Sequence, residues 1–142
     1  MWGAAMSNNP STYLDAPDLT RLDMASVIVL SWLDIPYLVG SCLTRPDFRD
    51  VDVRVILDDK RYDALFPGAP WPHDHALRHL IEASVSEHYV RATGLRVDFQ
   101  IQRGTQANAR YPHKRIPLGI YPAWTRRQIS AEYAMVASEV RP

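Results

Sequence analysis

The chain has very little cysteine and no long apolar run. Cys42 is the only cysteine among the 142 residues, so no disulfide can form within the chain, which agrees with a reducing compartment. An apolar stretch at 25–33 is far shorter than the roughly 20 residues that a helix needs to cross a bilayer. Residues 1–10 lack the basic and apolar segments of a signal peptide. We therefore expect a cytoplasmic protein that does not enter a membrane.

An excess of charge of either sign is also missing. The formal net charge is zero and the isoelectric point is near 7.0. The whole molecule therefore has no long-range attraction for nucleic acid or for an acidic membrane, and any nucleic acid partner would need a local patch. The basic and aromatic segment 102–125 is the candidate for such a patch, and a solvated loop is the alternative interpretation.

The length and composition fit one domain. Domains commonly have about 100 to 150 residues, and 46% of these residues are hydrophobic, which is enough for an ordinary core. We expect residues 1–17 to be a loosely ordered N-terminal segment and residues 18–142 to form a single domain.

The sequence pattern predicts alternating helices and strands. Asp18 or Thr20 is expected to cap the first helix, Asp58 or Asp59 the second, and Gly94 to end the longest one. Helices are expected at 18–33, 60–66, 74–92 and 126–140, strands at 35–39, 50–57 and 95–101, and a loop at 102–125. The stripe expected to pack the longest helix on the sheet consists of Ala76, Leu77, Leu80, Ile81, Ser84, Val85, His88 and Tyr89.

The most informative stretch of the sequence is 37–57. An apolar run ends in Gly-Ser, a short polar loop follows, and two aspartates one residue apart open the next apolar run. Because side chains alternate along a strand, Asp50, Asp52 and Arg54 share one face. Neighbouring carboxylates repel each other and bury poorly, so this pair is either exposed to water or used to bind a cation.

A later segment, 95–101, repeats the alternation and carries a single carboxylate on its polar face, Asp98. If this strand and the strand with Asp50 and Asp52 pair in one sheet, the three aspartates meet on one surface. The pattern therefore favours a divalent cation site on that surface.

These residues together resemble a known family. Gly-Ser after an apolar strand, eight intervening residues, Asp-x-Asp on the next strand and a lone Asp on a later strand are similar to the nucleotidyltransferase superfamily of the DNA polymerase beta type. Its small members include the minimal nucleotidyltransferases and kanamycin nucleotidyltransferase, and the resemblance covers about residues 35–102. It implies an α/β (α+β) fold with a small mixed β-sheet flanked by helices. It also implies Mg²⁺- or Mn²⁺-dependent transfer of a nucleoside monophosphate from a nucleoside triphosphate to a hydroxyl of a protein, an RNA or a small molecule.

The same resemblance assigns roles to individual residues. Asp50, Asp52 and Asp98 would be the catalytic residues and the metal ligands. Gly40 would let the backbone approach the phosphates, which Ser41 would hold. The nearby cations that either contact the triphosphate or pair with the carboxylates are Arg49, Arg54, Lys60 and Arg96.

Two departures from the family keep other functions open. The turn after Gly-Ser is short and ends at Pro46, and no obvious second domain is present to select the acceptor. A partner subunit, a second copy of the chain or the segment 102–125 would then complete the cleft. A second hypothesis is a weakly active or inactive module of antitoxin-like type that works by docking a protein partner. A third is a solvated row of aspartates in an unrelated α/β fold.

Three further side chains, His73, His75 and Cys42, have an ordinary and a functional interpretation. His73 and His75 are either metal ligands or the polar start of a helix. His79 and His88 fall on the expected long helix and are expected to pack or to lie at the surface. Cys42 is either a reactive thiol or, as we expect, a small buried side chain.

Overall fold

The computed structural model describes residues 11–68, 75–110 and 114–120. Its elements are α2 (Ala16–Trp32), β1 (Pro36–Val39), the 3-10 turn η1 (Ser41–Leu43), β2 (Val51–Leu57), α3 (Asp59–Leu65), α4 (Ala76–Thr93), β3 (Val97–Arg103), α5 (Gly104–Arg110) and β4 (Ile116–Pro117). The strands form one mixed sheet in the order β3-β2-β1-β4. β1 is antiparallel to β2 and β4, whereas β2 and β3 are parallel. The predicted mixed α/β class is therefore confirmed.

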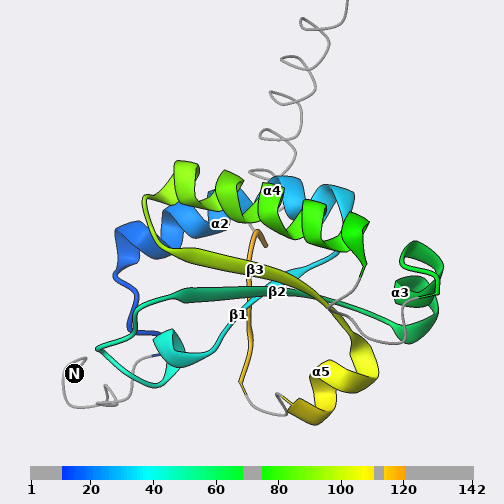
Figure 1. Ribbon diagram of the computed structural model, residues 1–142. Coiled ribbons are helices and arrows are strands. Elements are labelled where there is room, and N and C mark those ends of the chain that lie inside the picture. The colour runs from blue at the N-terminus through cyan, green and yellow to red at the C-terminus, as the bar shows by residue number, and fades with distance from the viewer. Residues whose placement is uncertain (1–10, 69–74, 111–113, 121–142) are drawn as a thin grey trace, which may run out of the picture.

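The helices α2 and α4 pack against each other and cover one face of the sheet (Figure 1). Val51, Val53 and Val55 of β2 are at most 1% exposed and belong to the core with Leu22 of α2 and Tyr89 of α4. Because side chains alternate along β2, the residues between these valines lie on the opposite face of the sheet. Among the described residues, no helix is long and apolar enough to cross a membrane.

The first helix begins earlier than the sequence pattern predicts. Asp15 is its N-cap, and its carboxylate accepts a hydrogen bond from the backbone N–H of Asp18 at 2.8 Å. Pro17 then occupies the first turn, where its missing N–H costs nothing, and the helix is already formed at Asp18 and Thr20. The expected cap at either of these two residues is therefore wrong. Residues 1–10 and the helix expected at 126–140 lie outside the described residues.

The expected stripe of α4 is wrong in part. The helix begins after His75, and Gly94 ends it in the left-handed conformation as predicted. Leu77 and Leu80 are 50% and 64% exposed. Tyr89 is buried, and Ile81 and Val85 pack against the core, as expected. The other side chains that α4 buries are Arg78, Glu82 and Thr93, which the stripe did not include.

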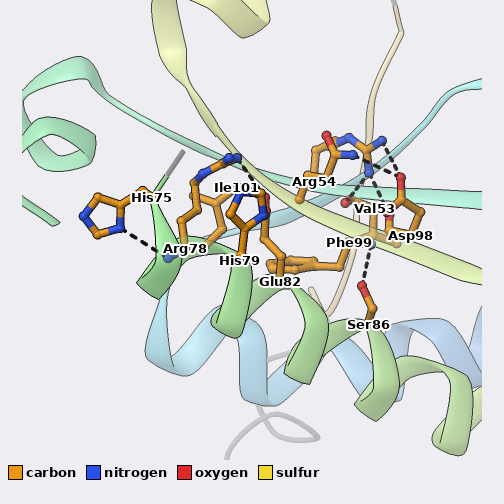
Figure 2. A network of polar contacts seen from close by, with 11 residues as sticks. Val53, Arg54, His75, Arg78, His79, Glu82, Ser86, Asp98, Phe99 and Ile101 are labelled. Carbon is orange, nitrogen blue, oxygen red and sulfur yellow. Dashed lines mark hydrogen bonds and ion pairs between the residues drawn. The ribbon is translucent and has the colours of Figure 1, made fainter. Parts of the chain in front are cut away.

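The burial of polar residues on α4 has a physical reason in the sheet. β3 is an edge strand, so the backbone N–H groups on its outer side have no partner strand. Ser86 Oγ accepts the N–H of Phe99 at 3.0 Å, and Glu82 Oε2 accepts the N–H of Ile101 at 2.8 Å. Glu82 Oε2 also accepts a bond from Arg78 at 3.2 Å. Figure 2 shows these side chains reaching from α4 to β3, where they take the place of a neighbouring strand.

The loop expected at 102–125 is also wrong for its described part. β3 extends to Arg103, α5 follows immediately, and β4 pairs with β1 through Leu38 and Ile116. The short α5 has no apolar periodicity to reveal it. Its first turn is held from outside the helix, because the Asp59 carboxylate accepts the N–H of Thr105 at 2.9 Å.

Glu82 provides a test of the edge contacts. Burial raises its pKa, against the opposing effects of the Ile101 N–H and Arg78. Because the pKa is raised in the folded state, the folded protein binds this proton more tightly than the unfolded chain does. The free energy of unfolding should therefore fall as the pH rises from about the ordinary value of 4.5 to the raised pKa. Glu82→Gln keeps an acceptor for Ile101 and should lack this slope. Glu82→Ala should lower the free energy of unfolding by about 3 kcal/mol, since it leaves Ile101 and Arg78 without their acceptor.

Urea denaturation of the two variants and the wild type between pH 4 and pH 8 measures both effects. Glu87→Gln is the matched control, because Glu87 lies on the same helix, pairs with Arg91 and has a 64% exposed side chain. It should change the free energy of unfolding by less than about 0.5 kcal/mol. Equal stability of Glu82→Ala and Glu82→Gln would show that the carboxylate does not hold the edge of β3.

Candidate active site

The parallel pairing of β2 and β3 brings the predicted carboxylates together. Asp52 and Asp98 are direct register partners on neighbouring strands, so both side chains lie on the face of the sheet opposite the core. Asp50 immediately precedes β2 and shares this face through the alternation of the strand. The side chains of Asp50, Asp52 and Asp98 are 52%, 26% and 49% exposed. The three carboxylates are therefore close to one another and accessible to a ligand.

Gly40 lies directly beside the Asp52 side chain. It follows β1, whose Val39 is the register partner of Asp52, and it precedes the turn η1. Its backbone has φ +83° and ψ −155°, a conformation that is essentially restricted to glycine. A Cβ at this position would lie 2.2 Å from Oδ2 of Asp52. The absence of a side chain at Gly40 is thus what allows the Asp52 carboxylate to sit against the backbone.

Arg54 lies between Asp52 and Asp98. Its Nη2 is 3.2 Å from Oδ2 of Asp98 and 3.5 Å from Oδ1 of Asp52. Its Nη1 donates to the backbone carbonyls of Asp98 at 2.7 Å and Val53 at 3.0 Å. The Arg54 side chain is only 6% exposed, and Figure 2 shows its guanidinium directed at Asp98. Of the two roles that the sequence left open for Arg54, the structure shows the pairing with carboxylates.

Gln100 is a member of this group that the sequence analysis missed. Its Nε2 donates to Oδ2 of Asp98 at 3.2 Å, the same oxygen that Arg54 contacts. The signal was present in the alternation of β3, which puts Gln100 on the face of Asp98 two residues further on. Two donors on one oxygen fix the orientation of the Asp98 carboxylate.

The pKa of the Asp52 carboxyl is raised above its ordinary value. Burial is the largest influence that raises its pKa, and the neighbouring charges of Asp98 and Asp50 raise it further. Arg54 opposes this shift without cancelling it. The carboxylate of Asp52 therefore favours the arrival of a proton or of another cation.

The other predicted site residues are placed at different distances from this group. Arg96 pairs with Asp50, with Nε 3.3 Å from Oδ1, and its side chain is 79% exposed. Arg49 is exposed just before β2, and Ser41 begins η1 directly after Gly40. Lys60 lies on α3, beyond the far end of β2, so the structure does not bring it to the aspartates.

The donor types fit a hard divalent cation, since carboxylate oxygens are the ligands that Mg²⁺ and Mn²⁺ prefer. The arrangement is nevertheless not closed around one point: in the described ranges, no three His, Cys, Asp or Glu residues form a group able to hold a metal ion. Arg54 pairs with both Asp52 and Asp98, and Arg96 pairs with Asp50. To bind one cation together, the three carboxylates would have to turn away from these guanidinium groups.

The remaining candidates have structural roles. His75 is the N-cap of α4, where its Nδ1 accepts the N–H of Arg78 at 3.4 Å. His88 bonds the carbonyl of Ala25 on α2 at 2.8 Å. Cys42 is buried, and burial raises the pKa of its thiol to about 11, which disfavours the reactive thiolate. His73 lies outside the described residues.

Comparisons with protein-family models, with curated proteins and with solved structures found no match for this chain.

Proposed function

We propose that this protein is a metal-dependent nucleotidyltransferase that moves a nucleoside monophosphate from a nucleoside triphosphate to a hydroxyl group. The observation that carries the proposal is the register pairing of Asp52 with Asp98 on an accessible face, with Gly40 against the Asp52 carboxylate. A pair of carboxylates on adjacent strands beside a glycine turn suits a reaction in which charge neutralisation and positioning do most of the work.

The proposed reaction assigns a role to each side chain. The acceptor oxygen attacks the α-phosphorus and forms a new P–O bond, while the bond to the bridging oxygen breaks and pyrophosphate leaves with that electron pair. Asp98 takes the proton of the acceptor hydroxyl. Its Oδ1 is the better candidate, because Arg54 and Gln100 both contact Oδ2. Gly40 and Ser41 provide the backbone against which the phosphates lie.

Asp50, Asp52 and Asp98 would hold Mg²⁺ or Mn²⁺, which, when bound, supplies positive charge against the triphosphate and the leaving oxygen. The residues of the chain then have to bring an acceptor to Asp98. A protein, an RNA end and a small molecule are therefore tested as acceptors in separate reactions.

The test is incubation with each of the four α-phosphate-labelled nucleoside triphosphates, with Mg²⁺ or Mn²⁺, and with the three acceptor classes in separate reactions. The expected result is label on one acceptor class that requires the divalent cation and disappears with a chelator. If no acceptor is labelled, and the triphosphate does not protect the protein against thermal unfolding with either cation, the proposal is wrong.

One observation favours a second function, a docking module of nucleotidyltransferase type with weak or no activity. Arg54 already contacts both Asp52 and Asp98, so part of the negative charge is neutralised within the protein. In such a module the carboxylates would keep their structural contacts, and binding to a protein partner would be unchanged by Asp52→Asn. If the wild type transfers nucleotides and Asp52→Asn does not, the docking module without activity is excluded.

A further inference from the structure

We propose that Arg54 is an internal competitor for the divalent cation, so that the free protein binds the cation weakly and removal of the guanidinium tightens binding. This inference rests on the proposed function in one respect, since it takes Asp52 and Asp98 as the ligands. It concerns how that site is regulated and not the transfer reaction itself.

The contacts of Arg54 place its positive charge where a cation would bind. The same nitrogen, Nη2, lies 3.2 Å from a carboxylate oxygen of Asp98 and 3.5 Å from one of Asp52. A divalent cation that bound these two oxygens at about 2.1 Å would have to replace Nη2. A cation on the other oxygen of either carboxylate would still lie close to the positive charge of the guanidinium, which repels it. In both cases Arg54 and the cation compete for Asp52 and Asp98.

The position of Arg54 is built into the fold. Its Nη1 donates to the carbonyls of Val53 and Asp98, so the guanidinium is held by the backbone of both strands as well as by the carboxylates. The side chain is 6% exposed, which weakens screening by water and salt.

The charge balance leads to the same conclusion. When all five groups are ionised, the carboxylates of Asp50, Asp52 and Asp98 and the guanidinium groups of Arg54 and Arg96 leave one net negative charge. A small net charge attracts a free divalent cation weakly. A triphosphate adds negative charge of its own, so the cation should bind far better together with the nucleotide than alone.

Electron paramagnetic resonance of Mn²⁺ measures the competition without any activity. Titrations of the folded wild-type protein, Arg54→Gln and Arg96→Gln are compared in the absence of nucleotide. Arg54→Gln should bind Mn²⁺ at least about tenfold more tightly than the wild type. Asp52→Asn added to Arg54→Gln should remove that gain. Equal Mn²⁺ affinity of Arg54→Gln and the wild type, or a gain that persists in the double variant, would overturn the proposal.

Arg96→Gln is the matched control, because it removes the same charge from the same group of carboxylates. The Arg96 side chain pairs with Asp50 at 3.3 Å and is 79% exposed, so water and salt screen its charge. Its effect on Mn²⁺ affinity should be about threefold or less. An effect as large as that of Arg54→Gln would mean that net charge alone sets the affinity, and the proposal would fail.

If Arg54→Gln does not fold, nuclear magnetic resonance of the wild-type side chains decides instead. Addition of Mg²⁺ should shift the guanidinium signals of Arg54 together with the carboxyl carbons of Asp52 and Asp98. Guanidinium signals that stay unchanged while those carbons shift, or carbons that do not respond to Mg²⁺ with or without a triphosphate, would overturn the proposal.

The outcomes separate this inference from the proposed function. Tighter Mn²⁺ binding by Arg54→Gln without any nucleotidyl transfer would keep Arg54 as the competitor and reject the enzyme. Transfer activity with unchanged Mn²⁺ affinity in Arg54→Gln would keep the enzyme and leave Arg54 as a structural residue only.

Discussion

Replacing Asp52 by asparagine is expected to lower the rate of metal-dependent nucleotidyl transfer by about a thousandfold or more. Asp52 is the central carboxylate of the group, since it is the register partner of Asp98 and contacts both Gly40 and Arg54. An amide keeps the shape but loses the negative charge that would hold the cation. Transfer of label to the acceptor under saturating nucleotide and Mg²⁺ is the measurement.

The fold of the Asp52→Asn variant should be preserved, which separates a chemical effect from unfolding. The pKa of Asp52 is raised chiefly by burial and then by the nearby charges of Asp98 and Asp50, so its ionised form is disfavoured in the folded protein. Asparagine removes this cost and also the ion pair with Arg54 at 3.5 Å. We expect the two effects to offset each other and to leave the free energy of unfolding within about 1 kcal/mol of the wild type.

Asp47→Asn is the control for Asp52→Asn. Asp47 pairs with Arg45 in the exposed segment between η1 and β2, and its side chain is 71% exposed. This variant removes the same charge outside the carboxylate group and should transfer at the wild-type rate. An unchanged rate in Asp52→Asn would reject the assignment of the site, and an equal loss in both variants would point to a general charge effect.

The sequence was sufficient for the face of each strand on which the carboxylates lie, because strand alternation follows from local pattern. The pairing of β2 with β3 entered the prediction only as a condition. Valines alternating with Asp52 and Arg54 predicted both the buried and the open face of β2, and β3 repeats the pattern around Asp98. What the sequence does not contain is the partner of each charge. Arg54 reaches the backbone carbonyl of Asp98 only because β2 and β3 are parallel in this register, which is a property of the sheet.

The errors in the helices have the same origin in tertiary structure. The stripe expected on α4 counted apolar residues, whereas the edge of β3 needs hydrogen-bond acceptors, so Glu82 is buried and Leu80 is exposed. The short helix α5 was missed because its first turn is held by Asp59, which lies 46 residues earlier than Thr105. Neither contact leaves a periodic signal in the chain.

Replacing Gly40 by alanine is expected to remove activity nearly as completely as Asp52→Asn, by a different route. The new Cβ would lie 2.2 Å from Oδ2 of Asp52 and 3.1 Å from its Cγ, so the carboxylate has to swing away from its position beside β1. The backbone at φ +83° and ψ −155° adds strain for any residue with a side chain. We expect transfer to fall by about a hundredfold or more and the free energy of unfolding to fall by about 2 to 3 kcal/mol.

Gly94→Ala separates backbone strain from the contact with Asp52. Gly94 ends α4 at φ +73°, and a Cβ there would meet nothing within 4 Å, so this variant should lose about 1 kcal/mol of its free energy of unfolding and keep full activity.

Adding Asp52→Ala to Gly40→Ala removes the side chain that the new methyl group meets. The double variant should therefore be more stable than Gly40→Ala alone, while remaining inactive. The opposite result is a Gly40→Ala variant that is as stable as Gly94→Ala and still transfers label. That result would show that the Asp52 carboxylate can be displaced without loss of the reaction, and it would reject the role of the Gly40–Asp52 contact in positioning this carboxylate.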